Sequence, residues 1–407
     1  MVFVTNSSFQ ASDDNRSVIF NPFYHHSMLQ FDDCFDDLHH VNHFVHLPQI
    51  ICFPKLDLKE VLIACAKLVS NEDVLNAELL ISELRRMVSV SGEPIQRLGA
   101  YMLEGLVARL SSSGGMIYKP DHRLNTRILY EICPFFKFGY MSANGAIAEA
   151  MKYESRVHII DFCIGHGDQW VPLIQAFAKR PGGPPHFRIT GFHDSPNGLG
   201  KEGKRLCKLA KAYNVPFEFH TEAKLENVQV QYGEALAVNF AFVLHQVPDE
   251  SVSTQNHRDR VLRLVKSMKP KIVTLVEQES NINTAPFYPR FLEALDYYNA
   301  MFESIDITLP RDNKERIGVE QHCLARDVVN IIACEGNERV KRHELLKKWR
   351  LRFGMAGFSP CPLSPLVNGT IKRLLKKYNE RYRVEERDGA LYLGWMNRDL
   401  VASSAWK

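Results

Sequence analysis

Apolar residues recur at three- and four-residue spacing from about residue 55 to residue 155, which predicts a series of amphipathic helices. We expect these helices at residues 61–69, 74–88 and 94–110, and the Ser/Gly run at 111–115 ends the third. Leucine-rich stripes of this kind usually form the core between helices, but a groove between them can also receive a partner helix. We therefore expect residues 55–155 to form a leucine-rich helical cap.

The pattern changes at residue 156, where short apolar runs begin to alternate with helical stretches. The expected strands are residues 157–160, 187–192, 215–219, 235–243 and 271–276, and the intervening helices include residues 169–178 and 201–213. Such alternation is typical of βαβ units that build a parallel sheet. We therefore predict an α/β fold, with a mostly parallel, Rossmann-type sheet and helices on both of its faces.

A helical pattern covers residues 286–378, with breaks near Pro310, near Gly336 and at 354–365. Three short apolar runs then close the chain at residues 382–386, 390–395 and 400–406. The Asp388-Gly389 pair between the first two is a hairpin signal, so we expect an antiparallel pair at the edge of the sheet. Residues 156–407 are assigned to one α/β core.

Residues 1–54 have no sustained periodicity and differ in composition from the rest of the chain. They hold one basic residue against six aspartates, a net charge of −5, together with six of the 16 histidines and eight of the 24 phenylalanines. Acidic and aromatic residues alternate at 31–38, a pattern typical of segments that stay solvated until they meet a partner. We expect a disordered tail here, and we expect no metal site from its histidines.

Composition bounds the class of protein further. The nine cysteines are scattered without a CxxC pair, which argues against a disulfide framework and against a thiolate zinc site. Neither a signal peptide nor an apolar run of roughly 20 residues is present, so we expect no membrane contact and a reducing compartment.

Residues 339–383 hold 13 Lys/Arg against two Glu, a local charge of +11. Such a run is usually a solvated helix face, and direct DNA binding is the alternative.

One stretch has the pattern of a ligand site, where a predicted buried strand ends at Asp161 and the turn Gly165-His166-Gly167 follows. Glycines at such a turn let backbone amides and a helix N-terminus approach a ligand closely. The layout resembles the first motif of class I S-adenosylmethionine-dependent methyltransferases, in which Asp194 would take the place of the acidic residue that contacts a ribose. That resemblance implies a methyltransferase-like core.

Several residues of this stretch depart from an active methyltransferase. Cys163 stands where the first glycine of the loop is usual, and the segment after the fourth strand lacks the Asp/Asn-Pro-Pro-aromatic motif. Asp161 and Asp168 fit equally well as a strand-end carboxylate and a helix N-cap. We expect His158 to point into the sheet core and His245 to cap a helix. We therefore expect no cofactor and no catalysis, with a methyltransferase as the alternative.

The complete string Val157-His158-Ile159-Ile160-Asp161 is far more specific than the glycine pattern, and it resembles the signature of the plant GRAS family of scarecrow-like regulators. Leucine-rich helices flank it at 56–110 and 201–231, and the family order continues to the C-terminus. The remaining matching residues are Pro286, Phe287, Tyr288, Arg339, Glu344, Trp349, Gly357, Trp395, Ser404, Ala405 and Trp406. The resemblance covers residues 55–407, and strings such as 87–110 and 138–151 are similar to the phytochrome A signal transduction branch. No DELLA motif occurs in the N-terminal segment.

The resemblance implies a nuclear transcriptional co-regulator in plant light or hormone signalling, with the cytoplasm as a second compartment. It implies contacts with zinc-finger transcription factors and with other GRAS proteins through the helical cap. Homo- or heterodimers and indirect association with promoter DNA follow from the same likeness. We expect the terminal motifs to be structural. Trp395 and Trp406 should pack together or against the sheet, and Arg339 should pair with Glu344.

Overall fold

The computed structural model describes residues 57–117, 126–195 and 197–407, and the predicted tail at 1–54 lies outside them. A single mixed sheet organises the described chain, with strand order β3-β2-β1-β4-β5-β9-β8-β7 and a short β6 beside β9. The parallel strands are β1 (Arg156–Asp161), β2 (His186–Phe192), β3 (Phe217–Glu222), β4 (Ala235–Ala241) and β5 (Ile272–Gln278). The predicted Rossmann-type, mostly parallel sheet is confirmed, because 3-2-1-4-5 is a doubly wound order.

Alternate residues of the central strands supply two separate cores. In β1, Val157 and Ile159 belong to one apolar cluster, while Ile160 belongs to the other. The first cluster packs against α6 (Pro134–Ala150), α7 (Trp170–Ala178) and α8 (Gly200–Ala212). The second packs against α9 (His257–Ser267) and α13 (Leu346–Met355). The sheet is therefore covered on both faces, as its nearly continuous apolar strands require.

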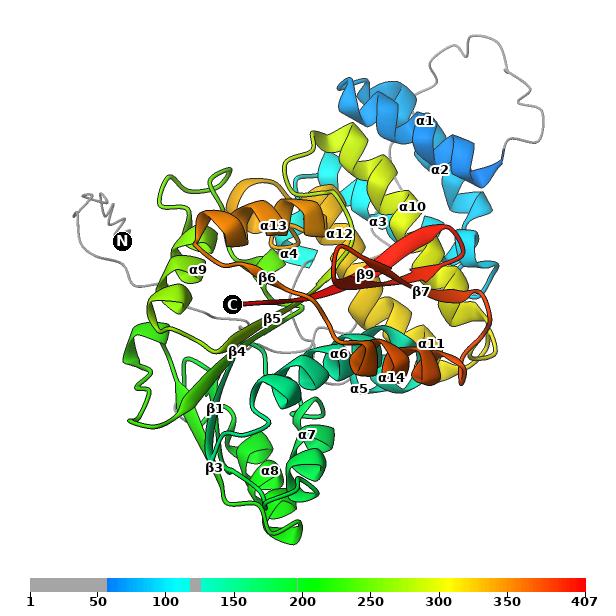
Figure 1. Ribbon diagram of the computed structural model, residues 1–407. Helices are drawn as coiled ribbons and strands as arrows, with labels where there is room; N and C mark the ends of the chain where they lie inside the picture. The colour runs from blue at the N-terminus through cyan, green and yellow to red at the C-terminus, as the bar shows by residue number, and fades with distance from the viewer. Residues whose placement is uncertain (1–56, 118–125, 196) are drawn as a thin grey trace, which may run out of the picture.

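The first three helices, α1 (Leu58–Ser70), α2 (Val74–Met87) and α3 (Pro94–Leu110), pack on one another at one end of the molecule (Figure 1). Later parts of the chain join them, because α3 also packs on α10 (Phe287–Asp306) and α12 (Ala325–Ala333). A Cβ on Gly105 of α3 would lie 3.0 Å from the Cβ of Ile332, so the missing side chain lets α12 approach closely. The segment that follows α10 thus completes the helical layer.

Helix α6 lies within the residues expected in the cap, yet it packs on β5 and β9 of the sheet. A Cβ on Gly139 would lie 2.5 Å from Val276 Cγ1, which shows how closely the helix and β5 approach. Ser142 Oγ also donates a hydrogen bond of 2.6 Å to Ser403 Oγ on β9. The remaining helices are α4 (Gly114–Ile117), α5 (Thr126–Ile132), α11 (Lys314–Val319), α14 (Pro365–Leu375), the π-helix η3 (Glu320–Leu324) and the 3₁₀ turns η1 (Leu225–Asn227), η2 (Leu244–Gln246) and η4 (Gly336–Glu338).

The C-terminal strands extend the sheet by more than the expected antiparallel pair. β9 (Arg398–Trp406) runs antiparallel to β5. β8 (Ala390–Trp395) pairs with β9, and β7 (Tyr382–Arg387) pairs with β8 at the edge of the sheet. The short β6 (Pro360–Cys361) also pairs with β9, and all of these pairs are antiparallel. No helix of the described chain is both long enough and apolar enough to cross a bilayer.

Candidate functional site

The candidate site lies at the carboxyl edge of the parallel strands, beside the ends of β1 and β4. Residues 162–169 connect β1 to α7, residues 242–247 follow β4, and Gln278 ends β5. The chain order reverses between β1 and β4, and ligands of doubly wound sheets bind in the crevice at such a point. The predicted loop therefore stands in the position that a cofactor would require.

Asp161, the strand-end carboxylate, is fully buried and accepts three hydrogen bonds from the protein. It accepts from Trp170 Nε1 at 2.8 Å, from Asn239 Nδ2 at 3.0 Å and from the Cys163 amide at 3.2 Å. Burial raises the pKa of this carboxyl to about 6, against the opposing effect of those hydrogen bonds. Asp161 thus joins β1, β4 and the start of α7, and it has the structural role that the sequence left open.

The glycine turn has the expected backbone but a different use of its polar residues. Gly165 and Gly167 adopt φ values of 52° and 74°, which other residues rarely tolerate. The predicted N-cap at Asp168 is wrong. Gln169 is the N-cap residue of α7, and Asp168 pairs with Arg205 of α8 at 2.9 Å instead. Because Asp168 lies one residue too early to cap the helix, its carboxylate turns toward the neighbouring cation.

Aromatic side chains of the protein occupy much of the space beside the loop. Phe242, which follows β4 with a φ of 56°, packs edge-on against Phe136 at 4.9 Å and lies near Tyr140 of α6. Asp194, the residue expected near a ribose, is exposed and is not among the residues that line the remaining cavity. The geometry therefore does not bring the two expected cofactor carboxylates, Asp161 and Asp194, to one ligand.

The remaining cavity has a volume of about 160 Å³. Sites that bury drug-sized ligands have roughly 300–1,000 Å³. The wall of the cavity in this protein includes Cys163, whose side chain takes the place of the loop's usual glycine. The residues present therefore do not fit S-adenosylmethionine.

A buried pair of histidines lies beside this cavity, and one of them, His245, forms part of its wall. His245 Nδ1 lies 2.8 Å from Glu277 Oε2, and the His245 ring stacks on His343 with centroids 4.1 Å apart. The prediction that His245 caps a helix is wrong, because Glu277 at the end of β5 holds its ring inside the protein. Burial raises the pKa of Glu277 to about 6 and holds the pKa of both histidines well below the usual range.

Among the described residues, these three side chains are the group whose ligand atoms lie close enough to hold a metal ion, within 4.8 Å of one another. The two rings are only 29° from parallel, so their lone pairs lie in nearly parallel planes and do not converge. Lys341 and Arg258 also act on His245 as nearby positive charges. Neither ring nitrogen of His343 has a hydrogen bond in the described chain, so the arrangement is a hydrogen-bonded His245–Glu277 pair with the His343 ring stacked on it.

Comparison with known proteins identifies the family. The GRAS domain family model matches residues 58–407. The chain belongs to the GRAS domain family. It is 67% identical over 373 residues to scarecrow-like transcription factor PAT1 of Arabidopsis thaliana, which covers 86% of this chain and 76% of that protein. Scarecrow-like protein 21 of the same plant is 63% identical over 366 residues, covering 86% of this chain and 88% of that protein.

A solved structure supports the same conclusion. The crystal structure of SCL7 from Oryza sativa superposes with a TM-score of 0.76 at 32% identity, covering 87% of this chain and all of that one. These matches confirm the GRAS resemblance, and the identity to PAT1 confirms the predicted branch.

The first GRAS motifs occupy structural positions in this chain. His158 is fully buried, as predicted, and its Nε2 lies 2.8 Å from Thr190 Oγ1 on β2. Pro286 is the N-cap residue of α10, and Phe287 lies beneath the guanidinium of Arg109 of α3 at 4.0 Å. Tyr288 packs at the edge of the larger core. The Pro-Phe-Tyr motif thus begins the helix that supports the cap and contacts the cap directly.

The predicted ion pair between Arg339 and Glu344 is wrong. Arg339 donates to the backbone oxygens of Ile282 and Asn283, at 3.0 and 2.7 Å. Glu344 pairs instead with Arg352 at 2.8 Å, and with the buried Arg258 at 3.1 Å. The two residues lie in a non-helical segment, and side chains five positions apart in an extended chain point to opposite sides.

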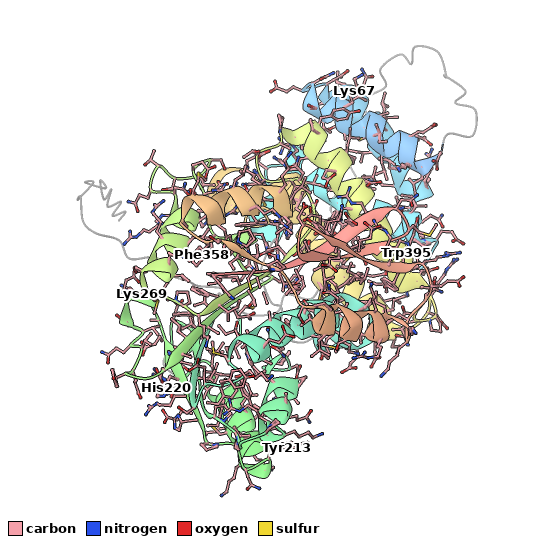
Figure 2. All side chains as sticks on the ribbon, in the orientation of Figure 1. Lys67, Tyr213, His220, Lys269, Phe358 and Trp395 are labelled. Carbon is pink, nitrogen blue, oxygen red and sulfur yellow. The ribbon has the colours of Figure 1, made fainter. Side chains whose placement is uncertain are left out.

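The C-terminal GRAS motifs secure both faces of the sheet. Trp395 packs edge-on against Tyr382, while Trp406 stacks on Phe353 of α13 at 4.7 Å, so the two tryptophans do not pack together. They belong to different cores, and Figure 2 shows Trp395 well apart from Phe358, the neighbour of Phe353. The other motif residues are Trp349, buried beneath Arg258, Gly357 with a φ of 87°, Ser404, which accepts from Trp406 Nε1, and Ala405, which pairs with Thr274.

The basic stretch at 339–383 is partly internal. Arg339, Lys341, Arg342 and Arg352 are all buried, with at most 6% of their surface exposed. Buried cations cannot contact phosphates, so these four do not contribute to a solvated basic face. Sequence reasoning also missed Glu277, although a glutamate inside the apolar strand β5 is a signal that it has a buried partner.

Proposed function

We propose that this GRAS protein regulates transcription in the nucleus by binding other transcription factors and carries out no chemistry of its own. Family membership supports the regulatory role. The observation that carries the non-catalytic part is the buried carboxylate of Asp161, which is held by three hydrogen bonds from the protein at the point where this class of sheet binds ligands. A carboxylate that accepts three internal hydrogen bonds and is fully buried is a structural element of the loop.

The proposed interaction surface is the helical cap, which we define as α1–α3 and which packs on α10 and α12. Helix α2 presents apolar side chains that nothing in the described chain covers, since Leu75 is 78% and Leu79 is 64% exposed. They lie four residues apart and therefore on the same helix face. Two exposed leucines on one helix face suit a partner that offers an apolar groove, such as a zinc-finger transcription factor or another GRAS protein. Promoter DNA would then be reached indirectly, through that partner.

A two-hybrid assay with either kind of partner tests this surface. Replacing Leu75 and Leu79 together by Asp should abolish pairing, because both side chains would carry charge into an apolar contact. Leu366→Asp, at a 68% exposed position on α14, is the matched control and should leave pairing intact. Equal pairing by all three proteins would remove the cap face from the proposal.

Titration calorimetry tests the non-catalytic part. S-adenosylmethionine added to the purified chain should give no saturable heat, and Cys163→Gly should not create binding, because Phe242 and Tyr140 still fill the space beside the loop. Micromolar binding together with methylation of any acceptor would support the methyltransferase alternative instead.

A further inference from the structure

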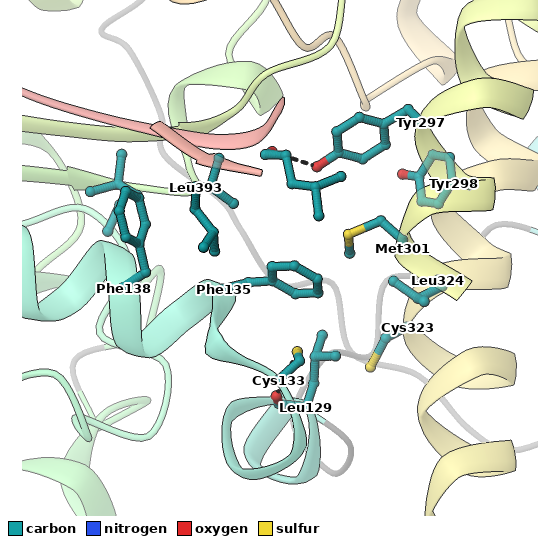
Figure 3. Packing of buried hydrophobic residues seen from close by; sticks show 14 of the residues in the cluster. Leu129, Cys133, Phe135, Phe138, Tyr297, Tyr298, Met301, Cys323, Leu324 and Leu393 are labelled. Carbon is teal, nitrogen blue, oxygen red and sulfur yellow. Dashed lines mark hydrogen bonds between the residues drawn. The ribbon is translucent and has the colours of Figure 1, made fainter. Parts of the chain in front are cut away.

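The cavity at the carboxyl edge lies between the sheet and the helices that carry the cap. On one side it is lined by the loop after β1 and by the ends of β4 and β5, and on the other by α10, η3 and α12. Figure 3 shows its apolar wall, where Leu129 and Phe135 lie opposite Met301, Cys323 and Leu324. The last two side chains belong to the π-helix η3, a rare element that is often found at functional sites.

Two buried hydrogen-bond acceptors in the wall of this cavity have no partner. His245 donates through Nδ1 to Glu277, which already accepts from the amides of Val243 and His245 and is therefore the acceptor. The neutral ring then presents Nε2 as an acceptor, and this buried atom has no hydrogen bond. Gln278 Oε1, at the end of β5, is also buried and without a hydrogen bond.

Unsatisfied buried acceptors are uncommon in native proteins and call for a donor from a ligand or a water. The same wall holds the buried ion pair of Lys341 and Asp327, at 3.1 Å, which can both donate to and accept from a hydroxyl group. The volume of about 160 Å³ is close to that of an engineered cavity of roughly 150 Å³ that binds benzene. The cavity therefore has room for about one six-membered ring, and its wall holds acceptors that lack a hydrogen-bond donor.

We propose that this cavity binds a small molecule about the size of one six-membered ring, with an apolar body and at least one hydroxyl donor. The body packs against Phe135, Phe136 and Met301, and the hydroxyl group donates to His245 Nε2 or Gln278 Oε1. Because the wall includes both the sheet edge and α10, the bound molecule stabilises the arrangement of the cap helices on the core.

Phenol and benzene are the probes, since they differ by one hydroxyl group. Thermal unfolding and calorimetry of the full chain should show that phenol binds, raising the melting temperature by about 2 °C at ten times its Kd, and that benzene binds at least tenfold more weakly. Gln278→Met removes one acceptor with little change in volume and should weaken phenol roughly tenfold or less while leaving benzene unchanged. Cys163→Phe adds a ring at a residue that lines the cavity and should abolish binding of both probes.

Three results would overturn the proposal. Equal binding of phenol and benzene would show an apolar void without hydroxyl selection. Failure of both probes to bind would show that the cavity holds water alone. Phenol binding that neither substitution weakens would place the probe elsewhere on the protein.

Discussion

Glu344 is a residue at which a small change of shape should cause a large loss of stability. Its carboxylate is fully buried, pairs with Arg258, Arg352 and the partly exposed Lys348, and also accepts a hydrogen bond of 2.7 Å from Asn283. Glu344→Gln keeps the shape and removes the charge, so that Arg258 is left with Asp249 at 3.6 Å as its nearest carboxylate. Breaking a buried ion pair on one side typically destabilises a protein by about 3–5 kcal/mol.

The pKa of Glu344 gives a second measure of the same interaction. Burial alone would raise this pKa, but the hydrogen bonds from Arg352 and the charge of Arg258 outweigh burial and lower it from 4.5 to about 2. At about 1.4 kcal/mol for each tenfold change, that difference corresponds to about 3 kcal/mol. We therefore expect Glu344→Gln to lower the free energy of unfolding by about 3 kcal/mol at pH 7, measured by urea titration with an unchanged m value.

Glu250→Gln is the matched control, because Glu250 pairs with the same Arg352 at 2.9 Å but has a side chain that is 52% exposed. Solvent screens this pair, so its loss should lower the free energy of unfolding by less than about 1 kcal/mol. Equal effects of the two substitutions would refute the reasoning that burial determines the strength of this network.

Two further predictions concern pH and packing. The pKa values of Asp249 and Glu344 are both lowered to about 2, so the stability that these carboxylates contribute is present above their unfolded pKa values. That stability is lost as the pH falls from about 5 toward 2. Urea titrations at successive pH values should therefore show a steeper fall in the free energy of unfolding over that range for the native chain than for Glu344→Gln. Gly139→Ala should lower the melting temperature and destabilise the protein by about 1–3 kcal/mol, because the new Cβ would meet Val276 at 2.5 Å. The control Gly354→Ala should leave the melting temperature unchanged, because a Cβ there meets nothing within 4 Å. Equal effects of the two substitutions would contradict the packing of α6 on β5.

The sheet was predictable from the sequence because its central strands are nearly continuous apolar runs. The expected strand at 157–160 is β1 at Arg156–Asp161, and the expected helix at 169–178 is α7 at Trp170–Ala178. Buried parallel strands carry this signal in their own residues. Pairing of β9 with β5 was not predictable, because it joins segments that are distant in sequence and depends on their long-range register.

The site was less predictable than the fold. The glycine turn was found correctly, since Gly165 and Gly167 need backbone conformations that few other residues adopt. The partners of Asp168, His245 and Glu344 were not, because Arg205, Glu277 and Arg258 lie on elements that only the tertiary structure brings near. Helical periodicity likewise shows that α10 has a buried face but not that this face packs on α3.

The most direct test of the proposed function is affinity capture from plant nuclei. Three forms of the full chain are used as bait, and the DNA-binding transcription factors recovered with each form are compared. We predict that the native chain and Asp194→Ala, changed at an exposed position outside the cavity, recover the same factors, while the double replacement of Leu75 and Leu79 by Asp recovers none of them. Full recovery by the double variant, or loss of recovery with Asp194→Ala, would contradict regulation through contacts of the cap.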